Sequence, residues 1–233
     1  MIIEDLGLIE YESAWKLQNE YASEIAQGKR LPTLLLLEHP HVFTFGRKGH
    51  AENLLWNEEQ LKQKGISTHW VDRGGDVTYH GPGQLVGYPL IPLTPLRPDG
   101  FQEESFNLED DSIKPARSDV TSDYVGYVRK LEKTLIAALI HLGVAAVQRP
   151  GLSGVWVQKE KPAKIAAIGI KVDARGVTRH GFALNVNPDM EYWNGIIACG
   201  LSEPVISLAD LLTPVPSMEK VKQEVAAAFK REF

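Results

Sequence analysis

Four short apolar segments follow one another between residues 144 and 186. We predict strands at Val144–Val147, Gly154–Val157, Lys164–Val172 and Val177–Val186, the last two joined by a hairpin turn at residues 173–176. Earlier in the chain, strand-like segments alternate with helix-like ones. Consecutive hairpins combined with such alternation predict an α/β (α+β) fold, in which helices pack against a mixed sheet rather than a doubly wound parallel one.

Hydrophobic periodicity predicts the remaining elements. Apolar residues recur every three or four positions in Tyr11–Gln27 and Asp123–Leu142, which is typical of amphipathic helices. The longest aliphatic run, Leu34–Leu37, is far shorter than the roughly 20 residues that cross a bilayer, so we interpret it as a buried strand. Further strands are predicted at Thr33–Glu38, His41–Phe45, Ile66–Val71 and Gln84–Ile91, and further helices at Asn57–Lys64, Ser207–Leu211 and Met218–Lys230.

The length of 233 residues allows one or two domains of about 150 residues, and we predict a single domain over residues 1–233. Proline-rich Pro92–Asp119 is predicted to be an irregular surface loop, with an acidic insertion at about residues 99–119. Seven acidic and two basic residues in that insertion account for the whole net charge of −5. The rest of the chain is neutral in sum, so no nucleic-acid partner is predicted, although a basic patch could still form.

The N-terminus lacks the basic segment and the long apolar stretch of a secretory signal. We therefore expect a cytoplasmic protein with no membrane partner. The single cysteine, Cys199, excludes an internal disulfide and a multi-cysteine metal site. The histidines at positions 39, 41 and 50 have no convincing ligand spacing, so no metal is predicted.

The densest group of polar side chains and glycines lies in the segment from Arg73 to Gln84. Its four glycines let a backbone approach a ligand closely, while Arg73, Thr78, Tyr79, His80 and Gln84 supply polar groups. The spacing is neither that of a phosphate-binding loop nor that of a dinucleotide-binding loop. A plain tight turn is the alternative, but the number of polar side chains favours a binding site.

Two further residues could carry chemistry. Lys164 opens an apolar strand, where a lysine commonly extends to solvent, but in a cleft its ammonium would stabilise an anion. Cys199 lies in an apolar run, where a lone cysteine is commonly inert, yet Gly195 and Gly200 leave its sulfur accessible. A thiol beside Lys164 or His80 would become a nucleophile at neutral pH. His180, at the start of a strand, is more typical of a structural histidine.

Together these segments resemble the octanoyl-acyl carrier protein:protein octanoyltransferases, which are related to biotin and lipoate protein ligases. Residues 73–88 match the family pattern R-G-G-x-x-T-(F/Y/W)-H-x-x-G-Q-x-x-x-Y. The segments Glu38–Pro40, Phe43–Gly46, Ala163–Gly169, His180–Asn185 and Ala198–Gly200 follow the family in order. The resemblance covers most of the chain and departs from the family chiefly at the acidic insertion.

The resemblance implies a biotin/lipoate protein ligase-like fold and transfer of an octanoyl group through a thioester on Cys199, whose pKa Lys164 lowers. It implies octanoyl-acyl carrier protein as the donor, and as acceptors the lipoyl domains of 2-oxoacid dehydrogenase complexes and the glycine cleavage H protein. No cofactor is expected, because the carrier thioester is already activated. The substrate-binding residues implied are Arg73, Gly74, Gly75, Asp76, Val77, Thr78, Tyr79, His80, Ala167, Ile168, Gly169, Gly181, Phe182 and Ala183.

Thioester exchange followed by amine attack divides this transfer into two easier steps, and cysteine suits the first. Lys164 could hold the thiolate and later accept a proton from the acceptor amine. Amides of Gly74, Gly75 or Gly169 could stabilise the tetrahedral oxyanion. Because both macromolecular substrates are typically acidic, we expect several of the basic residues in or near the motif segments to converge at the mouth of the site: Arg47, Lys48, Arg73, Arg149, Lys159, Lys161 and Arg179.

Three other functions fit parts of the pattern. An ATP-dependent lipoate or biotin ligase would share the fold, form an acyl-adenylate and need no cysteine. A non-catalytic acyl-chain or carrier-protein binding module would use Cys199 only for packing. A cysteine hydrolase would pair Cys199 with His80 or His180 and release free octanoate.

Overall fold

The computed structural model describes residues 1–93, 123–198 and 204–233. Cys199 and all but the first two residues of the predicted loop Pro92–Asp119 lie outside these ranges. Among the described residues, no helix is both long and apolar enough to span a membrane.

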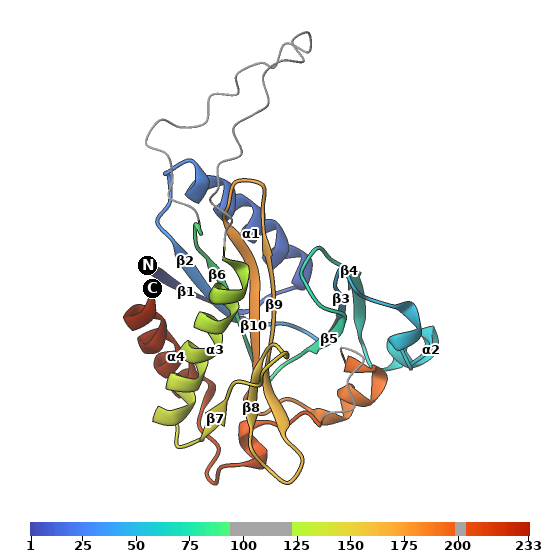
Figure 1. Cartoon of the computed structure of the whole chain (residues 1–233). Coiled ribbons are helices and arrows are strands. Elements are labelled where there is room, and N and C mark those ends of the chain that lie inside the picture. The colour runs from blue at the N-terminus through green and yellow to red at the C-terminus, as the bar shows by residue number, and fades with distance from the viewer. Residues whose placement is uncertain (94–122, 199–203) are drawn as a thin grey trace.

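A seven-stranded mixed sheet forms the centre of the molecule (Figure 1). β1 runs parallel to β2, and every other neighbouring pair in this sheet is antiparallel. In spatial order the strands are β1 (Ile2–Leu8), β2 (Thr33–Glu38), β6 (Gln84–Leu90), β10 (Thr178–Asn185), β9 (Ala163–Val172), β8 (Val155–Val157) and β7 (Ala146–Val147). The sheet and the packed helices confirm the predicted α/β (α+β) class with a mixed sheet.

A second, three-stranded sheet lies beside the first, to the right in Figure 1. Its strands are β4 (Ser67–Trp70), β3 (Val42–Phe45) and β5 (Val77–His80), in that order, and the short helix α2 (Glu58–Gln63) lies close to it. β5 was not predicted, because the glycines around it indicated a turn. Residues 72–76 bend before β5, and residues 82–83 form the turn between β5 and β6.

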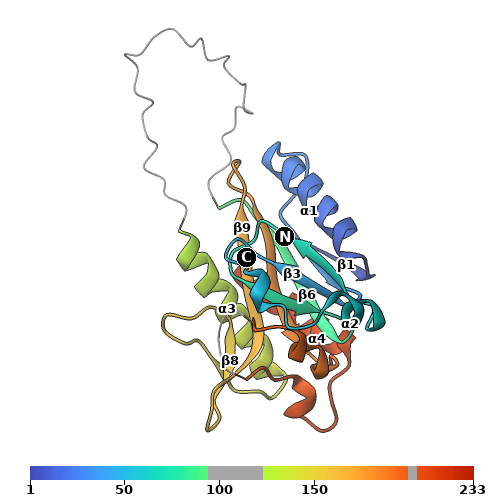
Figure 2. The ribbon, with the colours of Figure 1, turned by 90° about the vertical axis from the view of Figure 1, so that its right-hand side faces the viewer.

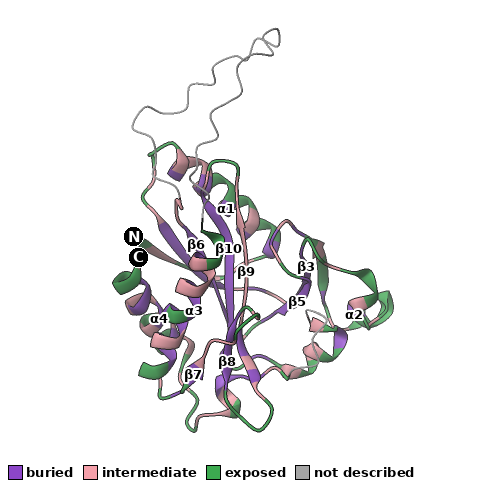
Figure 3. Cartoon of the chain, viewed as in Figure 1, coloured by how far each residue is buried: buried purple, intermediate pink, exposed green. Residues whose placement is uncertain are grey.

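Helices cover both faces of the large sheet (Figure 2). α1 (Tyr11–Ala26) packs on one face, and α3 (Tyr124–His141) and α4 (Met218–Glu232) pack on the other. Strand β2 serves both cores, because Leu34 and Leu36 join the α3 and α4 side while Leu35 and Leu37 join the α1 side. Figure 3 shows the central strands buried between these layers. The interpretation of Leu34–Leu37 as a buried strand is confirmed.

Most predicted elements are confirmed to within a few residues at each end. The long helices, the hairpin between β9 and β10, and the strands from β2 to β4 all form. Ser207–Leu211 is an exception, since only a three-residue 3₁₀ helix forms there, at Leu208–Asp210. The edge strand β1 and the 3₁₀ helices Ala51–Asn53 and Met190–Gly195 were not predicted.

Candidate functional site

A cavity of about 230 Å³ lies where the glycine-rich segment meets β9 and β10. It is smaller than the roughly 300–1,000 Å³ pockets that hold drug-sized ligands, so it suits a slender molecule. The sequence-predicted residues that line it are Arg73, Gly74, Gly75, Thr78, His80, Ala167, Ile168, Gly169, Gly181, Phe182 and Ala183. Three segments far apart in the chain therefore meet at one cavity.

Asp76, Val77 and Tyr79 do not line the cavity. The Asp76 carboxylate accepts hydrogen bonds from the amides of His50 and Val77, at 3.3 and 2.7 Å. Val77 and Tyr79 point to the other face of β5, because side chains alternate along a strand. There they pack in a cluster with Ile196, in the segment that leads to Cys199. These two residues thus support that segment from behind.

Arg73 forms part of the cavity wall from a buried position, with 7% of its surface exposed. Its guanidinium donates to the Thr44 carbonyl at 2.6 Å, to the Thr44 hydroxyl at 2.9 Å and to the Gly74 carbonyl at 3.0 Å. Arg179 is also buried, with 8% exposed. Arg73 and Arg179 are therefore not among the residues that could form an exposed basic patch.

The loop Arg73-Gly74-Gly75 packs directly on β9. The Gly74 amide donates to the Ile170 carbonyl at 2.9 Å, so it is not free to stabilise an oxyanion. A β-carbon at Gly169 would lie 3.0 Å from the Gly74 carbonyl oxygen, which leaves room for glycine alone without a shift. Gly75 has a φ of +86°, a conformation that favours glycine.

Two buried neutral imidazoles lie at the cavity wall: His80 lines the cavity, and the ring of His39 lies 5.9 Å from that of His80. His39 donates from Nδ1 to the Ile9 carbonyl at 2.7 Å, so its Nε2 accepts a hydrogen bond from the Tyr88 hydroxyl at 2.8 Å. The Gln84 side-chain amide donates to two carbonyl groups, leaving its oxygen to accept from His80 Nδ1 at 2.8 Å. Burial lowers the pKa of His39 to about 4 and that of His80 to about 3. Both imidazoles are neutral at physiological pH.

These two histidines make a testable contribution to stability. Between pH 6.5 and pH 4 the unfolded chain protonates both residues while the folded chain leaves them largely neutral. The free energy of unfolding should therefore fall as the pH is lowered, by up to about 1.4 kcal/mol per pH unit for each histidine. When the free energy of unfolding, measured with urea, is plotted against pH, the slope for the His39→Gln variant should be smaller by the equivalent of about one proton. Equal slopes for variant and wild type would contradict this assignment.

Lys164 lies near the start of β9, where its ammonium sits 4.8 Å from the centre of the buried Trp156 ring. It does not line the cavity, but Ala167, three residues further along β9, does. The Lys164 amide donates to the Pro204 carbonyl at 2.8 Å, and its carbonyl accepts from the Ile206 amide at 3.0 Å. Lys164 is thereby fixed beside the segment that follows Cys199.

Six lining residues were not identified as binding residues from the sequence: Tyr11, Tyr88, Val128, Ser153, Ile170 and His180. Tyr88 ends the motif that begins at Arg73, so the motif itself could have indicated it. Tyr11 begins α1 and Val128 lies in α3, and both reach the cavity only through tertiary packing. Within the described ranges, no group of three or more His, Cys, Asp or Glu residues could hold a metal ion.

Comparisons with known proteins agree with one another. The model of the lipoyl protein ligase A/B catalytic domain matches residues 10–110 and 112–230. An octanoyltransferase of Solibacter usitatus is 42% identical over 231 residues, covering 99% of this chain and 92% of that protein. An octanoyltransferase of Gloeobacter violaceus is 41% identical over 228 residues, covering 97% and 87%.

Among solved structures, a bipartite lipoate protein ligase from Thermoplasma acidophilum, studied with its E2 lipoyl domain, superimposes with a TM-score of 0.69. The alignment covers 100% of this chain and 84% of that one at 18% identity. A lipoate-protein ligase A bound with ATP gives a TM-score of 0.63 at 16% identity, covering 99% and 83%. At these identities the likeness shows a shared fold, and this confirms the lipoate ligase-like architecture implied by the sequence.

Proposed function

The chain belongs to the lipoyl protein ligase A/B catalytic-domain family and, within it, to the octanoyltransferases, and from that membership we propose its reaction. It takes an octanoyl group from octanoyl-acyl carrier protein and delivers it to the lysine of lipoyl domains. The acceptors are the lipoyl domains of 2-oxoacid dehydrogenase complexes and the glycine cleavage H protein. Cys199 carries the octanoyl group between the two steps as a thioester.

The observation that carries this proposal is the match to octanoyltransferases over nearly the whole chain at 36–42% identity. The cavity supports it, because a volume of about 230 Å³ with largely apolar walls suits a slender acyl chain. The substrate-binding residues proposed are those of the sequence prediction. Asp76, Val77 and Tyr79 do not line the cavity and contribute indirectly. Asp76 holds the loop through its hydrogen bonds from the His50 and Val77 amides, and Val77 and Tyr79 pack in one cluster with Ile196.

The chemistry proceeds by two exchanges at the acyl carbon. The Cys199 thiolate attacks the carrier thioester, a new S–C bond forms, and the carrier thiolate leaves. The acceptor lysine amine then attacks the Cys199 thioester, an amide forms, and the Cys199 thiolate is restored. The Lys164 ammonium stabilises the thiolate and gives its proton to the departing carrier thiolate, and the neutral Lys164 amine then takes the proton lost by the attacking acceptor amine. The bonds from Lys164 to Pro204 and Ile206 support this pairing, since Cys199 is only five residues before Pro204.

Mass spectrometry tests the reaction directly. After mixing with octanoyl-acyl carrier protein, the chain should carry one hydroxylamine-labile octanoyl group on Cys199, and adding a lipoyl domain should move that group to its lysine. Activity only with free octanoate and ATP would establish a ligase instead. Release of free octanoate as the main product would establish a hydrolase, and binding without any reaction would establish a binding module.

Docking of the acidic donor should depend on salt. The expected basic residues that remain exposed are Arg47, Lys48, Lys159 and Lys161. Rim charges raise the association rate and are screened beyond about 8 Å at physiological ionic strength. The kcat/KM for octanoyl-acyl carrier protein should therefore fall steeply with added salt, while alkylation of Cys199 by a neutral reagent should not change. Turnover that is insensitive to salt would assign docking to apolar contacts.

We also propose that residues 1–233 form one catalytic domain and that the acidic insertion at about residues 99–119 is dispensable for chemistry. None of the proposed catalytic or substrate-binding residues lies within it. Deleting Phe101–Arg117 should leave single-turnover acylation of Cys199 within about three-fold of wild type, because connections between elements tolerate changes of length. A folded deletion variant that cannot be acylated would contradict this proposal.

A further inference from the structure

His180 is the one non-glycine residue with a positive φ, +56°, in the part of the chain that the structure describes. Its neighbours in β10 show how this backbone conformation changes the direction of the His180 side chain. Phe182 and Leu184 pack toward α3 and α4, whereas Ala183 packs toward α1. Regular alternation would send His180 to the same side as Phe182. The left-handed backbone turns it to the α1 side instead.

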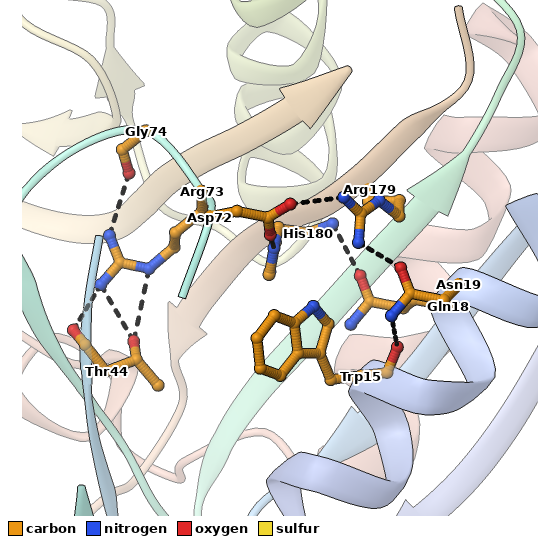
Figure 4. Close-up of polar contacts among 9 residues, drawn as sticks. All are labelled: Trp15, Gln18, Asn19, Thr44, Asp72, Arg73, Gly74, Arg179 and His180. Carbon is orange, nitrogen blue, oxygen red and sulfur yellow. Dashed lines mark hydrogen bonds and ion pairs between the residues drawn. The ribbon is translucent and has the colours of Figure 1, made fainter. Parts of the chain in front are cut away.

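On that side, several contacts hold His180 (Figure 4). Its amide donates to the Gln18 side-chain oxygen at 2.7 Å, and its ring lies 6.4 Å from that of Trp15 in α1. Its Nε2 donates to the Asp72 carboxylate at 2.8 Å. Such a conformation costs energy in a residue with a β-carbon, and it persists only where surrounding contacts determine it.

Asp72 connects this cluster to the cavity, since it directly precedes the loop Arg73-Gly74-Gly75. Its carboxylate also accepts from Arg179, which in turn donates to Asn19 of α1 (Figure 4). The loop is fixed a second time at Gly74, whose amide donates to the Ile170 carbonyl. Ile170 is the cross-strand partner of His180. One attachment at Asp72 and one at Gly74 therefore hold the loop against the β9–β10 hairpin.

We propose that Asp72 and His180 are positioning residues for the acyl-binding cavity. Their hydrogen bond fixes the Arg73-Gly74-Gly75 loop as a cavity wall, and the left-handed turn at His180 aims the imidazole at Asp72. The proposal rests on the proposed function for the identity of the ligand, an octanoyl chain, but not for the role of the pair.

The charge states of the pair support this arrangement. Hydrogen bonds from His180 and Arg179 hold the pKa of Asp72 well below its ordinary value, so it stays a carboxylate. Burial lowers the pKa of His180, so the ring is neutral and its single N–H is the one that Asp72 accepts. The bond therefore persists throughout the neutral pH range.

The test uses the full chain with Asp72→Ala, Asp72→Asn, His180→Gly, and the double variant Asp72→Ala/His180→Gly. Glycine adopts the φ of residue 180 without strain, so His180→Gly removes the imidazole, which also lines part of the cavity, and keeps the backbone conformation. Asp5→Ala is the matched control, because it removes a carboxylate paired with Lys222 at 2.8 Å on β1, away from the cavity. Four quantities are measured: the urea midpoint, hydrogen exchange of the segment 73–76, and KM and kcat with octanoyl-acyl carrier protein.

Asp72→Ala and His180→Gly should each speed exchange of residues 73–76 and raise KM by about 10- to 100-fold, with kcat nearly unchanged. The double variant should lose less than the sum of the two single losses, since the two residues share one hydrogen bond. Asp72→Asn should recover much of the loss, because its amide oxygen still accepts from His180. Asp5→Ala should change neither exchange nor KM.

Several results would contradict the proposed positioning role of Asp72 and His180. Unchanged exchange and KM in Asp72→Ala would do so, as would additive losses in the double variant, or a lowered urea midpoint as the sole effect. Failure of the proposed function looks different. Wild type would then not process octanoyl-acyl carrier protein, while the exchange of residues 73–76 would still decide whether Asp72 and His180 hold the loop.

Discussion

Cys199→Ser is expected to lower octanoyl transfer by at least about 1,000-fold, the loss typical of removing a nucleophile on which the mechanism depends. A serine hydroxyl beside an ammonium does not ionise at neutral pH as a thiol does. Any ester formed on it would also be a poorer acyl donor than a thioester. The measurement is the rate of octanoyl transfer to a lipoyl domain, together with the hydroxylamine-labile adduct.

Cys199→Ala serves as the matched control for this variant. It should be equally inactive and should bind octanoyl-acyl carrier protein as wild type does. Retention of more than a few per cent of transfer in either variant would eliminate the covalent mechanism and favour direct attack of the acceptor lysine on the carrier thioester.

Lys164→Ala is expected to lower transfer by about 100-fold or more, since it removes both the cation beside the thiolate and the proposed base. The variant keeps the hydrogen bonds to Pro204 and Ile206, because the Lys164 backbone makes them. It also keeps the buried Trp156 ring that lies beneath the ammonium. The fold should therefore persist. The pH profile of Cys199 alkylation should shift upward, toward the ordinary thiol pKa of about 8.5.

Lys161→Ala is the matched control, because Lys161 is an exposed lysine just before the same strand. It should leave the alkylation profile where it is in wild type. Lys164→Arg keeps the cation but cannot act as a base, so it should retain the low alkylation pKa while transfer stays slow. An alkylation profile that does not respond to Lys164→Ala would show that another group activates Cys199.

The parts of the fold that could be predicted were the elements whose own apolar and polar residues follow a helix or strand pattern. The apolar run Leu34–Leu37 and the apolar periodicity of the helix at residues 124–141 each lie within one continuous stretch of sequence. β5 was missed because its glycine-rich surroundings are typical of a turn, and its strand pairing depends on β3, more than 30 residues earlier. Long-range pairing overrides such local signals.

In the candidate site, too, features set by neighbouring residues could be predicted, and features set by long-range contacts could not. Its glycine-rich loop could be found because several polar residues cluster there in sequence. Arg73 and Arg179 were expected at an exposed rim, but their partners Thr44 and Asp72 lie 29 and 107 positions away. The sequence contains no sign of those pairings, so the burial of both guanidinium groups could not be predicted. The left-handed turn at His180 is likewise a product of contacts with α1 and Asp72.

The position of β10 in the sheet has a consequence for synthesis on the ribosome. β10 pairs with both β6 and β9, and it brings Gly181, Phe182 and Ala183 to the cavity. Until those residues emerge, β6 has an unpaired edge and the cavity lacks a wall. A nascent chain therefore passes through a stage in which the apolar strand β6 is open to wrong pairing. The wall of the cavity is complete only after about four-fifths of the chain has been made.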